Sequence, residues 1–222
     1  MIHQDIAPFP NLSSAGGALA RAVSRYDIGN VFVLAIVSAG VPVAVEVAKH
    51  LNRSLDLITI RRLLAPQGPG SQACAVNVAG NLVIDDAIGP QPPKPETPFD
   101  YFRADALDGL ASRTQLCRGE RPAAELTGKH LLIVDCGIRT ALTMQAAIGA
   151  ARTLNPARIT AAVPVTSSEG RAQIEPLVDE FIYLMEPEPF GNAGVWFKDF
   201  GRPRDEAISE LLDECSTSSI VP

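Results

Sequence analysis

Short apolar runs alternate with longer helical segments along most of this chain, and this alternation limits the possible folds more than any other feature. Strands are expected at residues 30–37, 55–60, 131–134, 158–165 and 180–184, and a hairpin at 73–78 and 82–84 with its turn at Gly80 and Asn81. Helices are expected at residues 15–26, 41–51, 99–117, 169–177 and 204–214, and after Thr143 as far as residue 154. This pattern predicts an α/β fold with a doubly wound, mainly parallel sheet that carries helices on both faces.

Composition sets wide limits on size and function. A chain of 222 residues with 46% apolar and 20% charged residues is typical of one globular domain, here residues 1–222. The net charge of −6 argues against a nucleic-acid partner, because phosphate backbones need a basic face. Five prolines within residues 89–98 exclude regular structure there and predict an exposed loop.

The thiols and the N-terminus favour a protein of the cytoplasm. The four cysteines show no C-x-x-C spacing, so free thiols in a reducing compartment are expected, with no zinc site (Cys74, Cys117, Cys136 and Cys215). The first residues do not read as a targeting segment. The apolar run at 31–48 contains Ser38, Pro42 and Glu46. A strand followed by a helix fits that run better than a membrane span, so no membrane partner is expected.

Residues 131–155 carry the clearest chemical signal. An apolar strand ends at Asp135, a loop of small and hydroxyl residues follows, and then an alanine-rich helix begins. The first turn of a helix leaves N–H groups unpaired and directs the positive end of its dipole into the loop, which favours an anion. Thr140 and Thr143 add hydroxyl donors, Arg139 adds charge, and Asp135 can accept hydrogen bonds from a sugar. The combination predicts a sugar-phosphate site.

This segment resembles the phosphoribosyl-pyrophosphate (PRPP) loop of the type I phosphoribosyltransferases. Residues 36–51 resemble the pyrophosphate loop and its helix in that family, 55–66 the second strand with its basic end, and 187–200 the C-terminal hood that covers the base. The four segments occur in family order. The resemblance implies the type I fold with a small C-terminal hood, Mg²⁺ as cofactor, a homodimer, and transfer of a phosphoribosyl group from PRPP to a nitrogenous acceptor.

The resemblance also implies roles for individual residues. The ribose phosphate would be bound by Asp135, which is also the catalytic candidate, and by the loop after it (Cys136, Gly137, Ile138, Arg139, Thr140, Ala141, Leu142 and Thr143). Pyrophosphate would be bound by Ser38, Ala39, Gly40, Arg61 and Arg62. Phe190 and Trp196 would contact the base, and Asp199 the metal. The alternatives to these binding roles are that Arg61 and Arg62 are ordinary surface charges and that the aromatic residues only pack in the core or the hood.

Three positions depart from the family pattern. Cys136 replaces the second acidic residue, Ala141 replaces the glycine of the phosphate turn, and Ser38 lies where a related subgroup has arginine. A thiol cannot replace a carboxylate that holds a ribose diol, and alanine restricts a positive φ. The departures leave open a protein that binds a nucleotide or ribose phosphate as a sensor or partner protein without turnover. A hydrolase that uses Cys136 as nucleophile is a weaker alternative, and Cys136 can also be simple packing.

Two further segments bear on function. Asp85 and Asp86 also follow an apolar run, but a proline-rich loop rather than a helix comes next, so a solvated turn is expected there, with a divalent-metal site as the alternative. The strand before the hood ends at Thr166 without the lysine that purine-salvage members carry. The resemblance therefore gives no support for a hypoxanthine or guanine acceptor.

Overall fold

The computed structural model describes residues 9–25, 31–64, 72–78, 81–86 and 98–217. Its described strands form one seven-stranded sheet in the order β4-β3-β2-β1-β5-β6-β7. The strands are β1 (Val31–Ile36), β2 (Leu55–Leu64), β3 (Gln72–Val78), β4 (Asn81–Asp86), β5 (His130–Val134), β6 (Arg158–Val165) and β7 (Glu180–Met185). β2, β1, β5, β6 and β7 run parallel, whereas β3 and β4 are antiparallel additions. The predicted mainly parallel α/β fold is confirmed.

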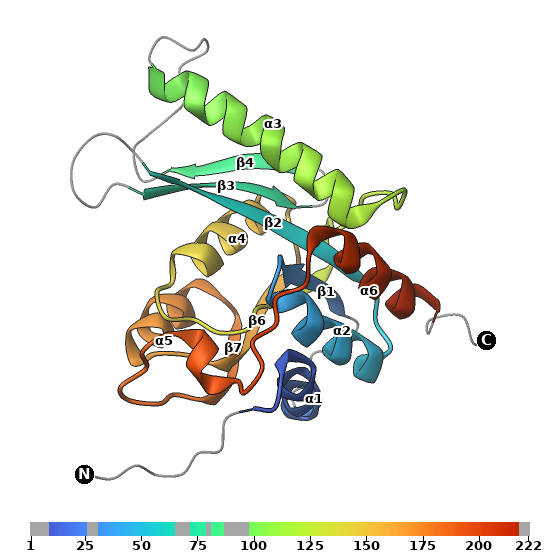
Figure 1. The fold of residues 1–222 in the computed structure, drawn as a ribbon, viewed down its shortest axis with the longest axis vertical. Helices are drawn as coiled ribbons and strands as arrows, with labels where there is room; N and C mark the ends of the chain where they lie inside the picture. Colours follow the sequence, from blue (N-terminus) through green and yellow to red (C-terminus); the bar gives the residue numbers. More distant parts are fainter. Residues whose placement is uncertain (1–8, 26–30, 65–71, 79–80, 87–97, 218–222) are drawn as a thin grey trace.

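Helices cover both faces of the sheet (Figure 1). They are α1 (Leu12–Val23), α2 (Gly40–Leu51), α3 (Pro98–Arg118), α4 (Leu142–Arg152), α5 (Ser168–Ile174) and α6 (Asp205–Thr217), with short 3₁₀ turns η1 (Glu175–Leu177) and η2 (Ala193–Trp196). One buried cluster joins the sheet to α1, α2 and α6, and the other joins its opposite face to α4 and α5. Across the described residues, no helix combines the length and apolar character needed to cross a membrane.

The central strands explain why the sequence signal is an unbroken apolar run. β1 and β5 are buried along almost their whole length. Val33 packs into the α1–α2 side, and its neighbour Leu34 packs into the α4–α5 side. Successive side chains of a strand point to opposite faces, so a strand covered on both faces needs apolar residues at every position.

Several element boundaries differ from those predicted. α1 begins before residue 15 because Asn11 caps it, with the Asn11 side chain accepting a 2.8 Å hydrogen bond from the Ser14 N–H. β2 continues through Arg61 and Arg62, which pair with β3, so the expectation that these arginines end a strand was wrong. The antiparallel strand β3 provides pairing partners for the backbone of these additional β2 residues.

The hairpin also corrects one expectation. The backbone of Asp85 and Asp86 belongs to β4 and pairs with β3, so the solvated turn expected at these aspartates was wrong. Asn81, expected in the turn, is the first residue of β4. Gly80 and the proline-rich stretch as far as residue 97 lie outside the described residues.

The contact between α1 and α2 gives a first testable prediction. A Cβ at Gly16 would lie 2.6 Å from the Val43 carbonyl oxygen and 2.9 Å from its Cα, and these backbone atoms can yield only if α2 moves. We expect Gly16→Ala to reduce the free energy of unfolding by roughly 1–3 kcal/mol through overpacking. Urea denaturation of the purified protein measures the loss.

The neighbouring glycine is a matched control. A Cβ at Gly17 meets nothing closer than the Arg21 guanidinium at 3.9 Å. Gly17→Ala should therefore stabilise the protein by up to about 1 kcal/mol, because alanine costs less conformational entropy in a helix than glycine. Equal effects of the two substitutions would contradict the close contact assigned to Gly16.

Candidate active site

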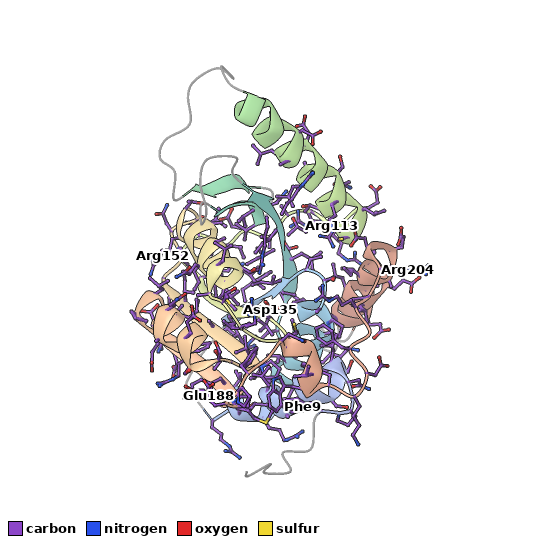
Figure 2. All side chains as sticks on the ribbon, turned by 60° about the vertical axis from the view of Figure 1, so that its left-hand side comes forward. Phe9, Arg113, Asp135, Arg152, Glu188 and Arg204 are labelled. Atoms are coloured by element: carbon purple, nitrogen blue, oxygen red, sulfur yellow. The ribbon has the colours of Figure 1, made fainter. Side chains whose placement is uncertain are left out.

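A cavity of about 500 Å³ lies at the carboxyl ends of the parallel strands. One wall is the turn after β1, including Ser38 and Ala39, and another is the loop after β5. Arg62 of β2 and Arg113 of α3 also line the cavity, as do residues 192–194, Phe200 and Arg202 of the C-terminal part. Figure 2 shows Asp135 at the centre of the molecule, with Arg113 on α3 above it. Ligands of parallel α/β sheets bind at this edge.

The loop after β5 reaches the cavity as the sequence predicts. Residues 135–140 line it together with Thr143 and Met144 of the first turn of α4. Ala141 occupies the N-cap and has no side-chain cap, so the first N–H groups of α4 are left for solvent or a ligand. Arg139 and Thr140 are exposed. The helix start therefore faces an open cavity and can hold an anion.

Arg62 and Thr143 meet across this cavity. The Arg62 guanidinium donates a 2.7 Å hydrogen bond to the Thr143 hydroxyl, which joins β2 to the first turn of α4. Both residues were predicted to bind parts of one phosphorylated ligand, and both line the same cavity. An arginine beside a helix N-terminus presents two kinds of donor to a phosphate oxygen.

The loop is braced from below by residues that the sequence analysis did not identify. The Ile138 N–H donates to the Val165 carbonyl at 2.9 Å, and the Ser167 N–H donates to the Ile138 carbonyl at 2.8 Å. The Ser167 hydroxyl donates to the Arg139 carbonyl at 2.7 Å and accepts from the Gly170 N–H at 2.9 Å. Serine as the N-cap of α5 was a usable sequence signal, but its contact with residue 139 is not local.

Close packing also requires small residues around the loop. A Cβ at Gly137 would lie 2.6 Å from the Val165 side chain and 3.1 Å from the Ala193 Cβ. A Cβ at Gly40 would lie 3.0 Å from the Val134 carbonyl oxygen and 3.1 Å from the Asp135 Cα. Gly40 therefore lets the start of α2 approach the end of β5, a packing role beneath the cavity rather than a place in its wall.

The cavity is strongly basic. Among the described residues, its lining contains four arginines (Arg62, Arg113, Arg139 and Arg202) and one carboxylate, Asp135. Loss of contact with water raises the pKa of Asp135 to about 6, while the Cys136 N–H, Arg202 and Arg62 act in the opposite direction. The Cys136 N–H donates to Asp135 Oδ1 at 2.7 Å. An excess of guanidinium groups around one half-buried carboxylate suits a ligand with several negative charges.

Cys136 is buried and packs in the cluster beneath the cavity. Burial and the neighbouring Asp135 raise the pKa of its thiol well above the ordinary value. The thiol is therefore protonated at neutral pH, whereas nucleophilic attack requires the thiolate. The structure gives no support to the hydrolase alternative.

The structure brings most of the predicted phosphate and pyrophosphate residues together, but not all of them. Gly40, Arg61, Ala141 and Leu142 are absent from the cavity lining. The guanidinium of Arg61 lies 3.8 Å from the Asp105 carboxylate, so it pairs toward α3. Ala141 is fully buried with φ −72°, a conformation that does not require glycine. The expected cost of alanine at this turn was therefore wrong.

The aromatic and metal candidates also lie elsewhere. Trp196 Nε1 donates to the Phe190 carbonyl at 3.0 Å, and their ring centroids are 6.5 Å apart, so the two rings pack on each other and neither lines the cavity. Asp199 is exposed and lies outside the lining as well. The N-terminal segment holds this stretch, because the Asp199 N–H donates to the Pro10 carbonyl at 3.0 Å. The base-contact role of Phe190 and Trp196 and the metal role of Asp199 stay predictions without geometric support.

Among the described residues, no group of three or more His, Cys, Asp or Glu side chains is placed to hold a metal ion. Any divalent cation at this site would need ligands from a phosphorylated substrate as well as from Asp135. Mg²⁺ sites that combine one or two carboxylates with substrate phosphates are common.

Comparison with known proteins gives this geometry a family. Residues 4–183 match the model of the phosphoribosyl transferase domain. The chain belongs to the phosphoribosyl transferase domain family. The type I resemblance seen in the sequence is confirmed at this level.

Relatives and solved structures agree with the assignment. The chain is 30% identical over 92% of its length to "Putative phosphoribosyl transferase Rv0571c" of Mycobacterium tuberculosis, but it spans only 46% of that protein. TT1426 from Thermus thermophilus is 29% identical with a TM-score of 0.77, over 93% of this chain and 98% of that one. A Neisseria gonorrhoeae protein solved with bound ppGpp has a TM-score of 0.51 over 94% of this chain and 90% of that one, and its 14% identity shows only the fold.

Proposed function

We propose that this chain binds PRPP in the cavity and transfers its phosphoribosyl group to a nitrogenous acceptor. The observation that carries the proposal is the joining of an open helix start, the Arg62–Thr143 pair and Asp135 in one basic cavity. A helix start suits the 5′-phosphate, the carboxylate suits the ribose hydroxyls, and the arginines suit the pyrophosphate.

Each wall of the cavity then has a role. The first turn of α4, with Thr140 and Thr143, would hold the 5′-phosphate, assisted by Arg139. Asp135 would accept hydrogen bonds from the ribose diol. Ser38 and Ala39 would face the pyrophosphate, with Arg62 at the border between pyrophosphate and 5′-phosphate. Mg²⁺, when bound to the pyrophosphate, would neutralise part of its charge.

In this reaction the protein mainly orients the two substrates and stabilises the charges that develop. The bond between C1 of the ribose and the pyrophosphate oxygen breaks, the sugar develops oxocarbenium character, and pyrophosphate leaves with the bonding electrons. The acceptor nitrogen forms the new bond to C1 and then loses its proton. Fixed donors around a phosphorylated sugar lower the barrier by orientation and preorganised electrostatics. Asp135, beside the ribose, is placed to stabilise positive charge that develops on the sugar.

Calorimetry with PRPP and Mg²⁺ tests the proposal directly. We expect saturable binding that requires both the 5′-phosphate and the pyrophosphate, so ribose 5-phosphate and pyrophosphate alone should each bind more weakly. Absence of PRPP binding by the purified chain would overturn the proposal. Release of pyrophosphate in the presence of an acceptor would then establish transfer. The cytoplasmic location, inferred from the thiols and the first residues, and the homodimer, implied by the family resemblance, are part of the same proposal. Analytical ultracentrifugation tests the homodimer.

A protein that binds a nucleotide or ribose phosphate without turnover is the second candidate. The observation that favours it is the buried, protonated Cys136 where the family has a carboxylate. Cys136→Asp separates the two candidates, with Ala141→Gly as a control that the φ of −72° predicts to be neutral. A large gain in PRPP affinity with Cys136→Asp would mean that the natural loop binds PRPP poorly, which favours the second candidate. No gain would mean that the loop with Cys136 already binds PRPP well, which favours the transferase.

A further inference from the structure

The predicted C-terminal hood (residues 187–200) continues into residues 201–204, and together these residues, called the extended hood below, present a charged group to the cavity instead of an open aromatic face. Phe190 and Trp196 pack on each other away from the lining. Phe200 does line the cavity, but the Arg202 guanidinium lies over its ring at 5.1 Å, and the Phe197 ring lies 5.2 Å from it. The Phe200 ring therefore already has a guanidinium and a second aromatic ring against it, which leaves less of its surface for a planar base.

Arg202 is the charged residue of this extended hood that lines the cavity, and it is exposed. Among the described residues its guanidinium makes no salt bridge or hydrogen bond, and it lies over the Phe200 ring at 5.1 Å. Arg202 lines the same cavity as Asp135 and Cys136, and its positive charge acts to lower the pKa of both groups. A guanidinium that rests on an aromatic ring keeps its N–H edge available to a ligand.

Arg113 holds this arrangement in place. Its Nε and Nη2 atoms each donate a 2.8 Å hydrogen bond to the Asp205 carboxylate at the start of α6, just after the extended hood. Arg113 also lines the cavity, so α3 contributes a second guanidinium on the side of the extended hood. The opposite end of the cavity already contains Arg62, Arg139 and the start of α4 for the phosphates of PRPP.

We propose that the acceptor carries a carboxylate and that Arg202 binds it, with Arg113 as the positioning residue. The inference rests on the proposed transferase function, which it makes more specific. The planar guanidinium of Arg202 matches a carboxylate in bidentate geometry, whereas a neutral base would offer it no charged partner; Arg113 is already paired with Asp205. The acceptor would then be recognised by its charge, whereas the family resemblance had implied that aromatic residues contact the base.

Matched pairs of heterocycles test this assignment. Orotate and uracil share one ring and differ by a carboxylate, and nicotinate and nicotinamide differ by carboxylate against amide. Each is titrated into the full chain in the presence of ribose 5-phosphate, Mg²⁺ and pyrophosphate, which occupy the phosphate end. We expect the carboxylate member of at least one pair to bind tenfold or more tightly than its neutral partner. Arg202→Gln should reduce that preference to under threefold, and Arg202→Lys should restore part of it.

Arg204→Gln is the control, because Arg204 is exposed, two residues further along the chain and outside the cavity lining (Figure 2). It removes the same charge and should leave the carboxylate preference unchanged. A preference that survives Arg202→Gln, or undetected or equal binding of both members of every pair, overturns the assignment. If PRPP binds while no pair shows a preference, only the acceptor assignment fails. If PRPP itself does not bind, the transferase proposal fails and the acceptor assignment with it.

Discussion

Replacing Asp135 by asparagine is expected to weaken PRPP binding about 100-fold at pH 7.5, because a carboxylate that accepts from a ribose diol contributes roughly 1.5–3 kcal/mol for each charge-assisted hydrogen bond. Asparagine keeps an oxygen for the Cys136 N–H, so the local hydrogen bond of the loop is retained. Calorimetry of the wild type and the variant measures the loss. An affinity within threefold of the wild type would show that Asp135 does not hold the ribose.

The pH dependence of binding gives the same substitution an internal control. Because burial raises the pKa of Asp135 to about 6, the carboxylate is protonated below that pH and ionised above it. Affinity of the wild type for PRPP should therefore rise between pH 5 and pH 7 with a midpoint near 6, beyond the change that the ligand's own phosphates produce. Asp135→Asn should show only the ligand's part of the pH profile.

Stability should move in the opposite direction to binding. The folded protein holds the proton of Asp135 up to about pH 6, whereas the unfolded chain releases it near the ordinary value of 3.8. The folded state thus binds more protons in this window, and the contribution of Asp135 to stability falls as pH rises through it. At pH 7.5 the asparagine variant should unfold at the same temperature as the wild type or higher. A lower melting temperature of Asp135→Asn would instead indicate that its weaker binding results from a destabilised fold.

Breaking the buried ion pair between α3 and β2 is expected to have the largest effect on stability. The Arg118 guanidinium donates to Asp56 at 2.9–3.0 Å, and both side chains are less than a tenth exposed. Asp56 also accepts from the N–H groups of Leu57 and Ala124. Arg118→Met would leave this carboxylate buried without its cation, at a cost of roughly 3–5 kcal/mol.

Chemical denaturation of Arg118→Met measures that loss, and Lys49→Met is the matched control. Lys49 also bonds a carboxylate, Glu214, at 2.9 Å, but with side chains 33% and 58% exposed. Exposed pairs contribute only about 0–1 kcal/mol. If both variants lost the same free energy of unfolding, burial would not be the reason for the larger contribution of the Arg118–Asp56 pair. Since α3 carries Arg113 into the cavity, Arg118→Met should also weaken the carboxylate preference proposed for the acceptor.

The sequence was sufficient for the features that depend on near neighbours. The repeat of apolar residues that marks a strand or a helix spans only a few positions, so the parallel sheet and the helices on both faces could be predicted. Asp135, Arg139, Thr140 and Thr143 occur in one continuous strand–loop–helix segment, so an anion site at the helix start could be predicted from that segment, whereas the cavity in front of it is seen only in the structure. The family resemblance and its order of motifs were likewise visible in the chain.

Tertiary packing decided the rest of the site. Arg113 and Arg202 reach the cavity because α3 and the extended hood close over the sheet, and residues so distant in sequence are joined only by long-range contacts. Phe190 and Trp196 lie outside the lining and pack on each other, and Asp199 lies in a segment whose backbone binds residues 9–10. The φ of Ala141 and the pKa of Asp135 depend on local packing and solvent access. Those quantities are properties of the folded surroundings, and no spacing of residues along the chain determines them.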